Sequence, residues 1–261
     1  MSKLTQYGHA FQIKALAILI TDRDFLQQIA DIVSPDYFDN DAGKWIMRET
    51  LKYFNEYKSV PTMEVFKVKV ESINQELQNV AVKDLLKQAY KASTSTDLNY
   101  VKDTFLDFCK NQTLKNAVQE WLDNPASSEK KYGHISNWDT SEVTSMEKLF
   151  LEAETFNEPL NNWDVSNVKN MNLMFFKASM FNQDIGSWDL SGVQTMHGMF
   201  AHTKCFNQNI GSWNVSNVKN MCQMFSNANS FNQDISNWNV KNVEFMFQMF
   251  SYTDSFNCPI G

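Results

Sequence analysis

The sequence predicts two modules: an all-α helical N-terminal domain, followed by an α/β leucine-rich-like right-handed solenoid of five 25-residue repeats. Two observations lead to this prediction. In the second half of the chain a tryptophan recurs every 25 residues, at Trp138, Trp163, Trp188, Trp213 and Trp238. In the first half, apolar residues recur at helical spacing and no repeat is found. We therefore expect a helical domain over residues 1–118 and a solenoid over residues 119–261.

The size and composition agree with two folded modules. The chain has 261 residues, of which 43% are hydrophobic and 20% charged, a balance typical of globular proteins. It holds 20 Phe and 13 Met but only 8 Gly. The repeats account for most of the Met and half of the Phe excess.

The first two helices are predicted from apolar residues that lie three or four positions apart. These are Phe11, Ala15, Ile18 and Leu19 in one helix, and Phe25, Ile29, Ile32 and Val33 in the next. Pro35 then breaks the chain before Tyr37 and Phe38. A third helix is expected from Asp41 to Tyr57.

The third helix should bury Trp45, Ile46, Leu51 and Phe54. After it, Pro61 ends the connection and Thr62 is a candidate N-cap for a helix carrying Met63, Phe66 and Val70. The residues from Ser93 to Thr96 form a polar break. A long amphipathic helix, marked by Leu98, Val101, Phe105 and Phe108, then runs toward Val118.

This order of helices resembles the N-terminal domain of DnaB-type replicative helicases of tailed phages. The resemblance is carried by residues 15–19, 29–34 and 36–38, a helix centred on Leu51, and the step from Pro61 to Thr62. In that family the domain self-associates and contacts primase, while a separate motor hydrolyses ATP. The resemblance therefore implies a replicative helicase or primase as partner, or self-association.

Each repeat carries further apolar columns besides its tryptophan. They are Val143, Val168, Val193, Val218 and Val243; Met146, Met171, Met196, Met221 and Met246; a pair ending in Phe150, Phe175, Phe200, Phe225 and Phe250; a Phe-Asn pair beginning at Phe156, Phe181, Phe206, Phe231 and Phe256; and Leu160, Ile185, Ile210, Ile235 and Ile260. An aromatic residue that recurs with the repeat is expected in the core rather than in a binding platform.

The spacing within a repeat predicts one helical segment and one short strand. Val, Met, Met and Phe lie at relative positions 0, 3, 6 and 7, which share one face of a helix. Ser141, Ser166, Ser191 and Ser216 precede the Val by two residues and are candidate helix caps. The strand is expected between the Phe-Asn pair and the next Trp. The recurrent Asn is expected to be buried and to bond the backbone of the neighbouring coil.

These columns closely resemble the BspA-like, mycoplasma-lipoprotein-type repeats, a divergent leucine-rich-like class. The resemblance covers roughly Trp121 to Gly261 and rests on the recurrent Trp, Val, Met, Phe-Asn and Ile. That family is usually linked to surface display, adhesion and protein–protein contact, and the resemblance implies no catalysis.

The chemistry of a helicase motor is not found in the sequence. An ATPase of this kind needs G-x-x-x-x-G-K followed by Ser or Thr, and Gly43-Lys44 has no preceding glycine loop. His9, His134, His197 and His202 are scattered, and the four Cys show no metal-ligand spacing. We therefore expect no enzyme activity, no catalytic, cofactor-binding or metal-binding residue, no cofactor and no small-molecule substrate.

The charge and the apolar runs limit the partners further. The net charge is −7, from 23 Lys plus Arg against 30 Asp plus Glu, so direct nucleic-acid binding is not expected. The acidic side chains gather in the repeats, where they form a solvated face or a contact surface for a basic partner. The run from Ala15 to Ile20 is too short to cross a membrane, and no cleavage site follows it. We expect a cytoplasmic protein.

Three hypotheses for function remain open. The protein could be a non-catalytic interaction protein linked to phage-type DNA replication, as a decoy or tether for helicase or primase. It could instead be a BspA-like recognition or adhesion repeat protein. It could also be a chimeric reading frame with no evolved joint function. Since no polar capping unit follows Ile260 and Gly261, we also expect the last coil to expose part of its core.

Overall fold

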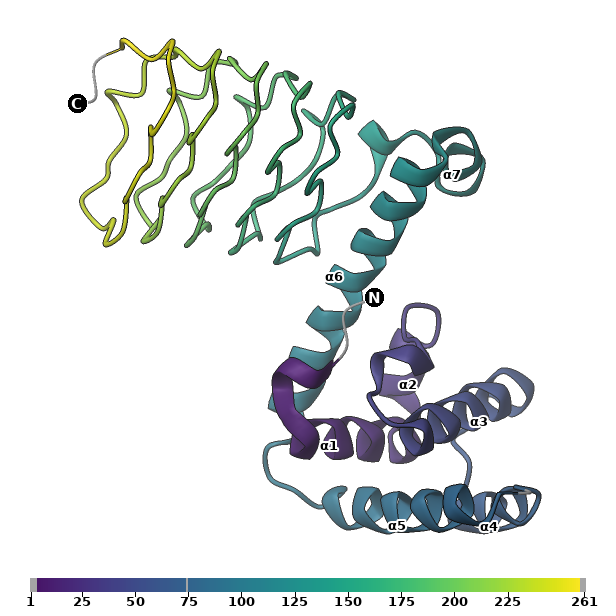
Figure 1. The fold of residues 1–261 in the computed structure, drawn as a ribbon. Helices are drawn as coiled ribbons and strands as arrows, with labels where there is room; N and C mark the ends of the chain where they lie inside the picture. The colour runs from purple at the N-terminus through teal and green to yellow at the C-terminus, as the bar shows by residue number, and fades with distance from the viewer. Residues whose placement is uncertain (1–3, 74, 259–261) are drawn as a thin grey trace. The chain divides into compact units, whose positions relative to one another are not determined.

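A computed structural model of the chain describes residues 4–73 and 75–258. The chain divides into two compact units, Met1–Gln112 and Thr113–Gly261 (Figure 1). The predicted boundary after residue 118 lies inside a single helix, α6 (Leu98–Asp123), whose first part belongs to the first unit and whose last turns belong to the second.

All regular elements in the described residues of the first unit are helices. Their order is η1 (Leu4–Tyr7), α1 (Gly8–Thr21), α2 (Arg23–Ile29), η2 (Pro35–Tyr37), α3 (Asp41–Tyr57), α4 (Met63–Glu71), α5 (Glu76–Ala92) and the start of α6. Helix α1 packs against α2, α3 and α5. Phe66, Phe105 and Phe108 are among the fully buried side chains of this core. The expected all-helical character of this part is confirmed.

Short polar residues begin three of these helices. The side chains of Asp22, Asn40 and Thr62 accept hydrogen bonds from the backbone N–H groups of Phe25, Gly43 and Val65. Each bond satisfies an N–H group that has no partner within its helix. The predictions of α3 from Asp41 to Tyr57 and of Thr62 as an N-cap are confirmed.

Some sequence expectations for the helices are wrong. Helix α2 ends at Ile29, so Ile32 and Val33 lie in the turn that follows. Trp45 and Leu51 are half-buried rather than buried. Helix α5, between the predicted fourth helix and the polar break, was not predicted.

In the second unit, two short elements and the end of α6 precede the repeats. They are α7 (Pro125–Tyr132) and η3 (Ile135–Asn137). Leu114, Val118 and Trp121 of α6 are buried in the same hydrophobic core as the side chains of the repeats. The end of α6 thus supplies apolar cover to the core of the repeats.

The repeats do not form an α/β leucine-rich-like right-handed solenoid, and this prediction is wrong. From residue 138 to residue 258 the chain contains turns and isolated bridges but no helix and no strand. The bridges are parallel and join Ser145, Asn170, Thr195, Asn220 and Phe245. They lie where a helix was expected, and the predicted strand before each Trp is absent from the described residues. The coils follow one another as a stack (Figure 1).

The backbone hydrogen bonds explain why no helix forms. The N–H groups of Met146, Lys148 and Phe150 donate to the carbonyl oxygens of Asn170, Asn172 and Met174 in the next coil, at 2.8 to 2.9 Å. These alternate N–H groups are therefore not available to carbonyls four residues back in their own coil.

Residues with a positive φ interrupt each coil twice. One set is Lys148, Leu173, Gly198, Gln223 and Gln248; the other is Glu152, Lys177, His202, Asn227 and Tyr252, all with φ between 55° and 62°. A residue in this left-handed region ends both helical and extended structure. The candidate helix caps consequently cap no helix. The backbone N–H groups of Ser141, Ser166, Ser191 and Ser216 donate to the side chains of Asp139, Asp164, Asp189 and Asn214 in tight turns.

The aromatic columns form the core of the stack, as predicted. The rings of Phe150, Phe175, Phe200, Phe225 and Phe250 are stacked with centroids 5.3 to 5.7 Å apart. Within each coil, such a ring also stacks on the Phe of the Phe-Asn pair, at 4.0 to 4.3 Å. Offset stacking of this kind adds to the stabilisation from burial.

The last described coil exposes several large apolar side chains. Met246 is 46% exposed, whereas Met171, Met196 and Met221 are fully buried. Phe245 and Phe247 are 58% and 71% exposed. Ile260, which was assigned to the Leu/Ile column, and Gly261 lie outside the described residues.

Candidate recognition surfaces

A set of polar side chains recurs from coil to coil of the repeat stack, at the Asn of each Phe-Asn pair and the two residues after it. We call this set the amide strip: Asn157, Asn182, Asn207 and Asn232; Gln183, Gln208 and Gln233; and Asp184, Asn209 and Asp234. The Oδ1 atoms of Asn157, Asn182, Asn207 and Asn232 accept hydrogen bonds from the backbone N–H of the equivalent Asn in the next coil, at 2.8 to 2.9 Å. The expected bond between coils is confirmed, but these Asn side chains are exposed rather than buried.

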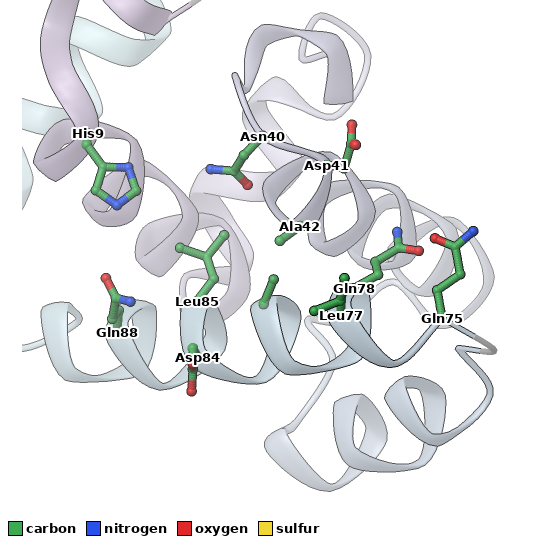
Figure 2. A pocket seen from close by; sticks show the side chains of 11 residues that line it. His9, Asn40, Asp41, Ala42, Gln75, Leu77, Gln78, Asp84, Leu85 and Gln88 are labelled. Atoms are coloured by element: carbon green, nitrogen blue, oxygen red, sulfur yellow. The ribbon is translucent and has the colours of Figure 1, made fainter.

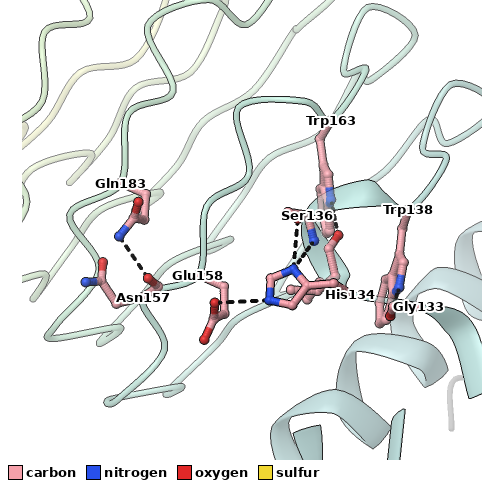
Figure 3. A network of polar contacts seen from close by, with 9 residues as sticks. Gly133, His134, Ser136, Trp138, Asn157, Glu158, Trp163 and Gln183 are labelled. Atoms are coloured by element: carbon pink, nitrogen blue, oxygen red, sulfur yellow. Dashed lines mark hydrogen bonds and ion pairs between the residues drawn. The ribbon is translucent and has the colours of Figure 1, made fainter. Parts of the chain in front are cut away.

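The glutamines of the strip are held in a similar way. The Nε2 atoms of Gln183, Gln208 and Gln233 donate to the carbonyl oxygens of Asn157, Asn182 and Asn207 in the preceding coil, at 2.9 to 3.0 Å (the first in Figure 3). Asp184, Asn209 and Asp234 accept from backbone N–H groups two residues on. Each side chain of the strip is therefore held by a hydrogen bond at one of its polar atoms.

A groove of about 660 Å³ lies on the first unit between α1, α3 and α5. Figure 2 shows His9 from the start of α1, Asn40 to Ala42 from the start of α3, and a row of residues along α5. Leu77 is 89% exposed. The amides of Gln75, Gln78 and Gln88 and the carboxylates of Asp41 and Asp84 also line the groove, with no lysine or arginine among the lining residues.

A second hollow of about 420 Å³ lies between α3 and α4. The rings of Tyr53 and Tyr57 lie 4.5 Å apart, and Val68 is 71% exposed. Glu56 and Glu64 are also among the lining residues. The first unit thus carries two hollows that combine exposed apolar side chains with carboxylates.

His134 connects η3 to the first coil (Figure 3). Its Nδ1 atom lies 2.8 Å from Ser136 Oγ and accepts from the backbone N–H of Ser136 at 3.3 Å. The other ring nitrogen, Nε2, lies 3.5 Å from Glu158 Oε2. The imidazole therefore acts as the cap of η3 and as a bridge to the first coil.

The scattered histidines and cysteines do not form a shared site. His197 and His202 lie on one coil, where the His202 ring meets Phe176 edge-to-face at 5.3 Å. Burial, followed by Lys177 and Lys204, lowers the pKa of His202. Cys109 is buried and Cys205 is exposed. Over residues 4–73 and 75–258, no group of three or more His, Cys, Asp and Glu residues could hold a metal ion.

Gly43, which with Lys44 lacks the glycine loop of an ATPase motif, lies in the first turn of α3. Its backbone N–H donates to Asn40 Oδ1 at 2.7 Å. The glycine therefore belongs to a helix start capped by Asn40.

None of the described helices is long and apolar enough to cross a membrane. The run from Ala15 to Ile20, considered above as an apolar segment, belongs to the buried part of α1.

A comparison with protein-family models identifies the repeat half of the chain. The family described as "Mycoplasma protein of unknown function, DUF285" matches residues 116–210 and 184–261. No curated protein and no solved structure matches the chain. The expected relation of residues 1–118 to replicative helicases, phage and DNA replication therefore has no support. The expected relation of the repeats to leucine-rich repeats is wrong, because residues 138–258 contain no strand.

Proposed function

The chain belongs to the DUF285 family of mycoplasma proteins of unknown function, and we propose that it is a non-catalytic protein-interaction protein of the BspA-like repeat kind. In this proposal the repeats form a rigid scaffold and the first unit holds a protein partner. The groove of Figure 2 carries the proposal, because it places the largely exposed Leu77 beside amides and carboxylates.

The chemistry of the groove favours a polypeptide with apolar and basic side chains. Burying Leu77 against a partner removes apolar surface from water. The amides of Gln75, Gln78 and Gln88 offer donors and acceptors to a peptide backbone. Asp41 and Asp84 attract cationic side chains, and no lysine or arginine is among the lining residues to oppose them.

Partner capture with matched variants tests this proposal. The full chain is used as bait in an extract of its native host, and bound proteins are identified by mass spectrometry. Leu77→Arg should abolish capture, because it places a cation in the groove. Val80→Arg, on the same helix but outside the groove lining and 53% exposed in the parent, should leave capture unchanged. Equal capture by both variants would contradict the proposed groove.

Two measurements address the remaining parts of the proposal. Native mass determination distinguishes a second copy of this chain from a different protein as the occupant of the groove. ATP hydrolysis by the purified chain, alone and with DNA, should be absent, and DNA-stimulated turnover would contradict a non-catalytic role.

Cell fractionation tests the surface role to which BspA-like repeats are usually linked. The family match favours such repeats, and a displayed adhesin would be recovered with the cell envelope. Recovery in the cytosol alone would reject that role while leaving the proposed protein contact intact.

A further inference from the structure

We propose that the amide strip of the repeat stack binds an uncharged linear polysaccharide. The strip lies on the second unit, so this inference is independent of the partner groove on the first unit.

The strip repeats the same polar groups from coil to coil. The Phe that precedes each Asn of the strip stacks on its equivalent in the next coil, with the Phe156, Phe181, Phe206 and Phe231 centroids 6.0 to 6.1 Å apart. Equivalent side chains of the strip therefore recur at about this interval. A polymer of identical units can make the same contact at successive coils, and linked weak contacts add up to useful affinity.

The strip atoms that have no protein partner include both donors and acceptors. In the described residues, the Nδ2 atoms of Asn157, Asn182 and Asn207 donate to no protein atom, because only Oδ1 is used between coils. The Oε1 atoms of Gln183 and Gln208 likewise accept from no protein atom, because only Nε2 is used. A hydroxyl group both donates and accepts, so a chain of sugar hydroxyls can satisfy both kinds of open atom.

The strip is fixed before any ligand arrives. Each of its side chains already makes at least one bond to backbone, which restricts its rotamers. Binding then costs less side-chain entropy than it would for freely rotating amides. The hydrogen bonds to backbone thus preorganise the side-chain atoms that have no protein partner for contact with a ligand.

The charge of the strip excludes anionic polymers as the favoured ligand. Its members are amides and the carboxylates of Asp184 and Asp234, and none is a lysine or arginine. A polyanion would be repelled by these carboxylates and would gain no cationic contact.

Small residues and one exposed apolar side chain lie next to members of the strip in the sequence. Gly186 and Gly211 follow Asp184 and Asn209 by two residues, and their backbone approaches the next coil closely. Ser187 and Ser212 come next. Met180, two residues before Asn182, is 53% exposed and offers apolar contact to the faces of sugar rings.

Affinity electrophoresis of the full chain in gels containing cellulose derivatives, soluble chitin derivatives, mannan or amylose tests the proposal. At least one of these neutral polysaccharides should retard the protein, and heparin should not. Retardation by heparin alone, or by none of the polymers, would overturn the proposal. The proposal would also be overturned if the chain bound an immobilised unrelated protein but none of the glycans.

Two variants separate binding from folding. The double variant Asn182→Asp, Asn207→Asp keeps the Oδ1 acceptor between coils but replaces the outward donor, and should weaken retardation at least tenfold with an unchanged unfolding midpoint. Gln208→Lys keeps a donor toward Asn182 but removes the outward acceptor, and should also weaken binding.

The matched control is the double variant Gln194→Glu, Gln248→Glu, which makes the same change in net charge outside the strip. It should be retarded like the parent chain. If the strip variants and this control bind equally, the strip is not the binding site and the proposal is wrong.

Discussion

The indole Nε1 of Trp188 donates a hydrogen bond to the backbone carbonyl oxygen of Leu160 in the preceding coil, at 3.0 Å. The same bond joins Trp163 to Ile135, Trp213 to Ile185 and Trp238 to Ile210, at 2.8 to 3.0 Å. These bonds are buried. Each of these tryptophans therefore packs in the core of its own coil and also forms a hydrogen bond to the preceding coil.

Replacing Trp188 by Phe should lower the free energy of unfolding by about 2–4 kcal/mol, because the carbonyl of Leu160 loses its donor while the smaller ring leaves space. Trp138→Phe is the matched control. The Trp138 indole N–H donates to the Gly133 carbonyl (Figure 3). This bond, 3.0 Å long, is exposed, so water can replace it and the loss should be smaller. Urea denaturation followed by circular dichroism measures both. Equal losses would contradict a special role for the buried bond.

Gly211→Ala should destabilise the stack by about 1–3 kcal/mol, because the new Cβ would lie 2.6 Å from the backbone oxygen of Asp234 in the next coil. The neighbouring backbones would have to separate to accept it. Ser236 occupies the equivalent position in the following coil, and Ser236→Ala adds no atom at Cβ. The unfolding midpoint in urea should therefore fall for Gly211→Ala and remain close to that of the parent for Ser236→Ala.

The core residues of the repeats could be predicted from the sequence, but the backbone conformation of the repeats could not. The Trp, Val, Met and Phe columns pack inward because apolar side chains recurring once per coil share one interior. Their 0, 3, 6 and 7 spacing suggested a helix, yet the segment is built from turns. The deciding feature is the positive φ at residues such as Lys148 and Glu152. Lysine and glutamate are common in helices, so their types gave no signal of this conformation.

The candidate surfaces depended on contacts that sequence spacing does not reveal. The Phe-Asn repeat indicated that Asn157 and its equivalents bond the neighbouring coil, and this is correct. It did not reveal that they are exposed, or that Gln183 uses only its nitrogen. The groove at Leu77 was also missed, because helix α5 was not predicted and the groove needs three helices to meet.

Lys177→Asn should stabilise the protein by about 0.5–1 kcal/mol. Lys177 has a φ of 58°, a conformation that is strained for most residues and better tolerated by Asn. Asn227 already occupies this position in the next coil but one, with the same φ. The ion pair between Lys177 and Glu152 is exposed and contributes little. Lys169→Asn, at a position without positive φ, should give no gain. Thermal unfolding of both variants checks this, and a gain in both would contradict the explanation.

Acid should weaken the stack through the aspartates beside the tryptophans. Hydrogen bonds from the Ser166 hydroxyl and backbone N–H lower the pKa of Asp164 from its ordinary value, and the equivalent serines lower the pKa of Asp139 and Asp189. A carboxyl with a lowered folded-state pKa stabilises the protein above its unfolded pKa of about 3.9 and loses that contribution as pH falls further. The free energy of unfolding should therefore decline below about pH 4.

The triple variant Asp139→Asn, Asp164→Asn, Asp189→Asn tests the origin of this decline. Asn214 occupies the same position in the fourth coil and accepts from the backbone N–H of Ser216 at 3.2 Å, so the turn tolerates Asn. The variant should show a shallower loss of stability between pH 4 and pH 2 in urea titrations. An unchanged slope would place the acid sensitivity in other carboxyl groups.

Cys109 should resist thiol reagents in the folded protein, whereas Cys205 should react. Burial raises the pKa of the Cys109 thiol, and its side chain is fully buried. The reactive species is the thiolate, which burial disfavours and shields from reagents. Cys205 is exposed on the repeat stack. Pulse labelling with an alkylating reagent at pH 8, followed by peptide mass spectrometry, should modify Cys205 in the native chain and Cys109 only in denaturant. Rapid labelling of Cys109 without denaturant would show that the core of the first unit opens readily, contrary to its close packing around Phe105 and Phe108.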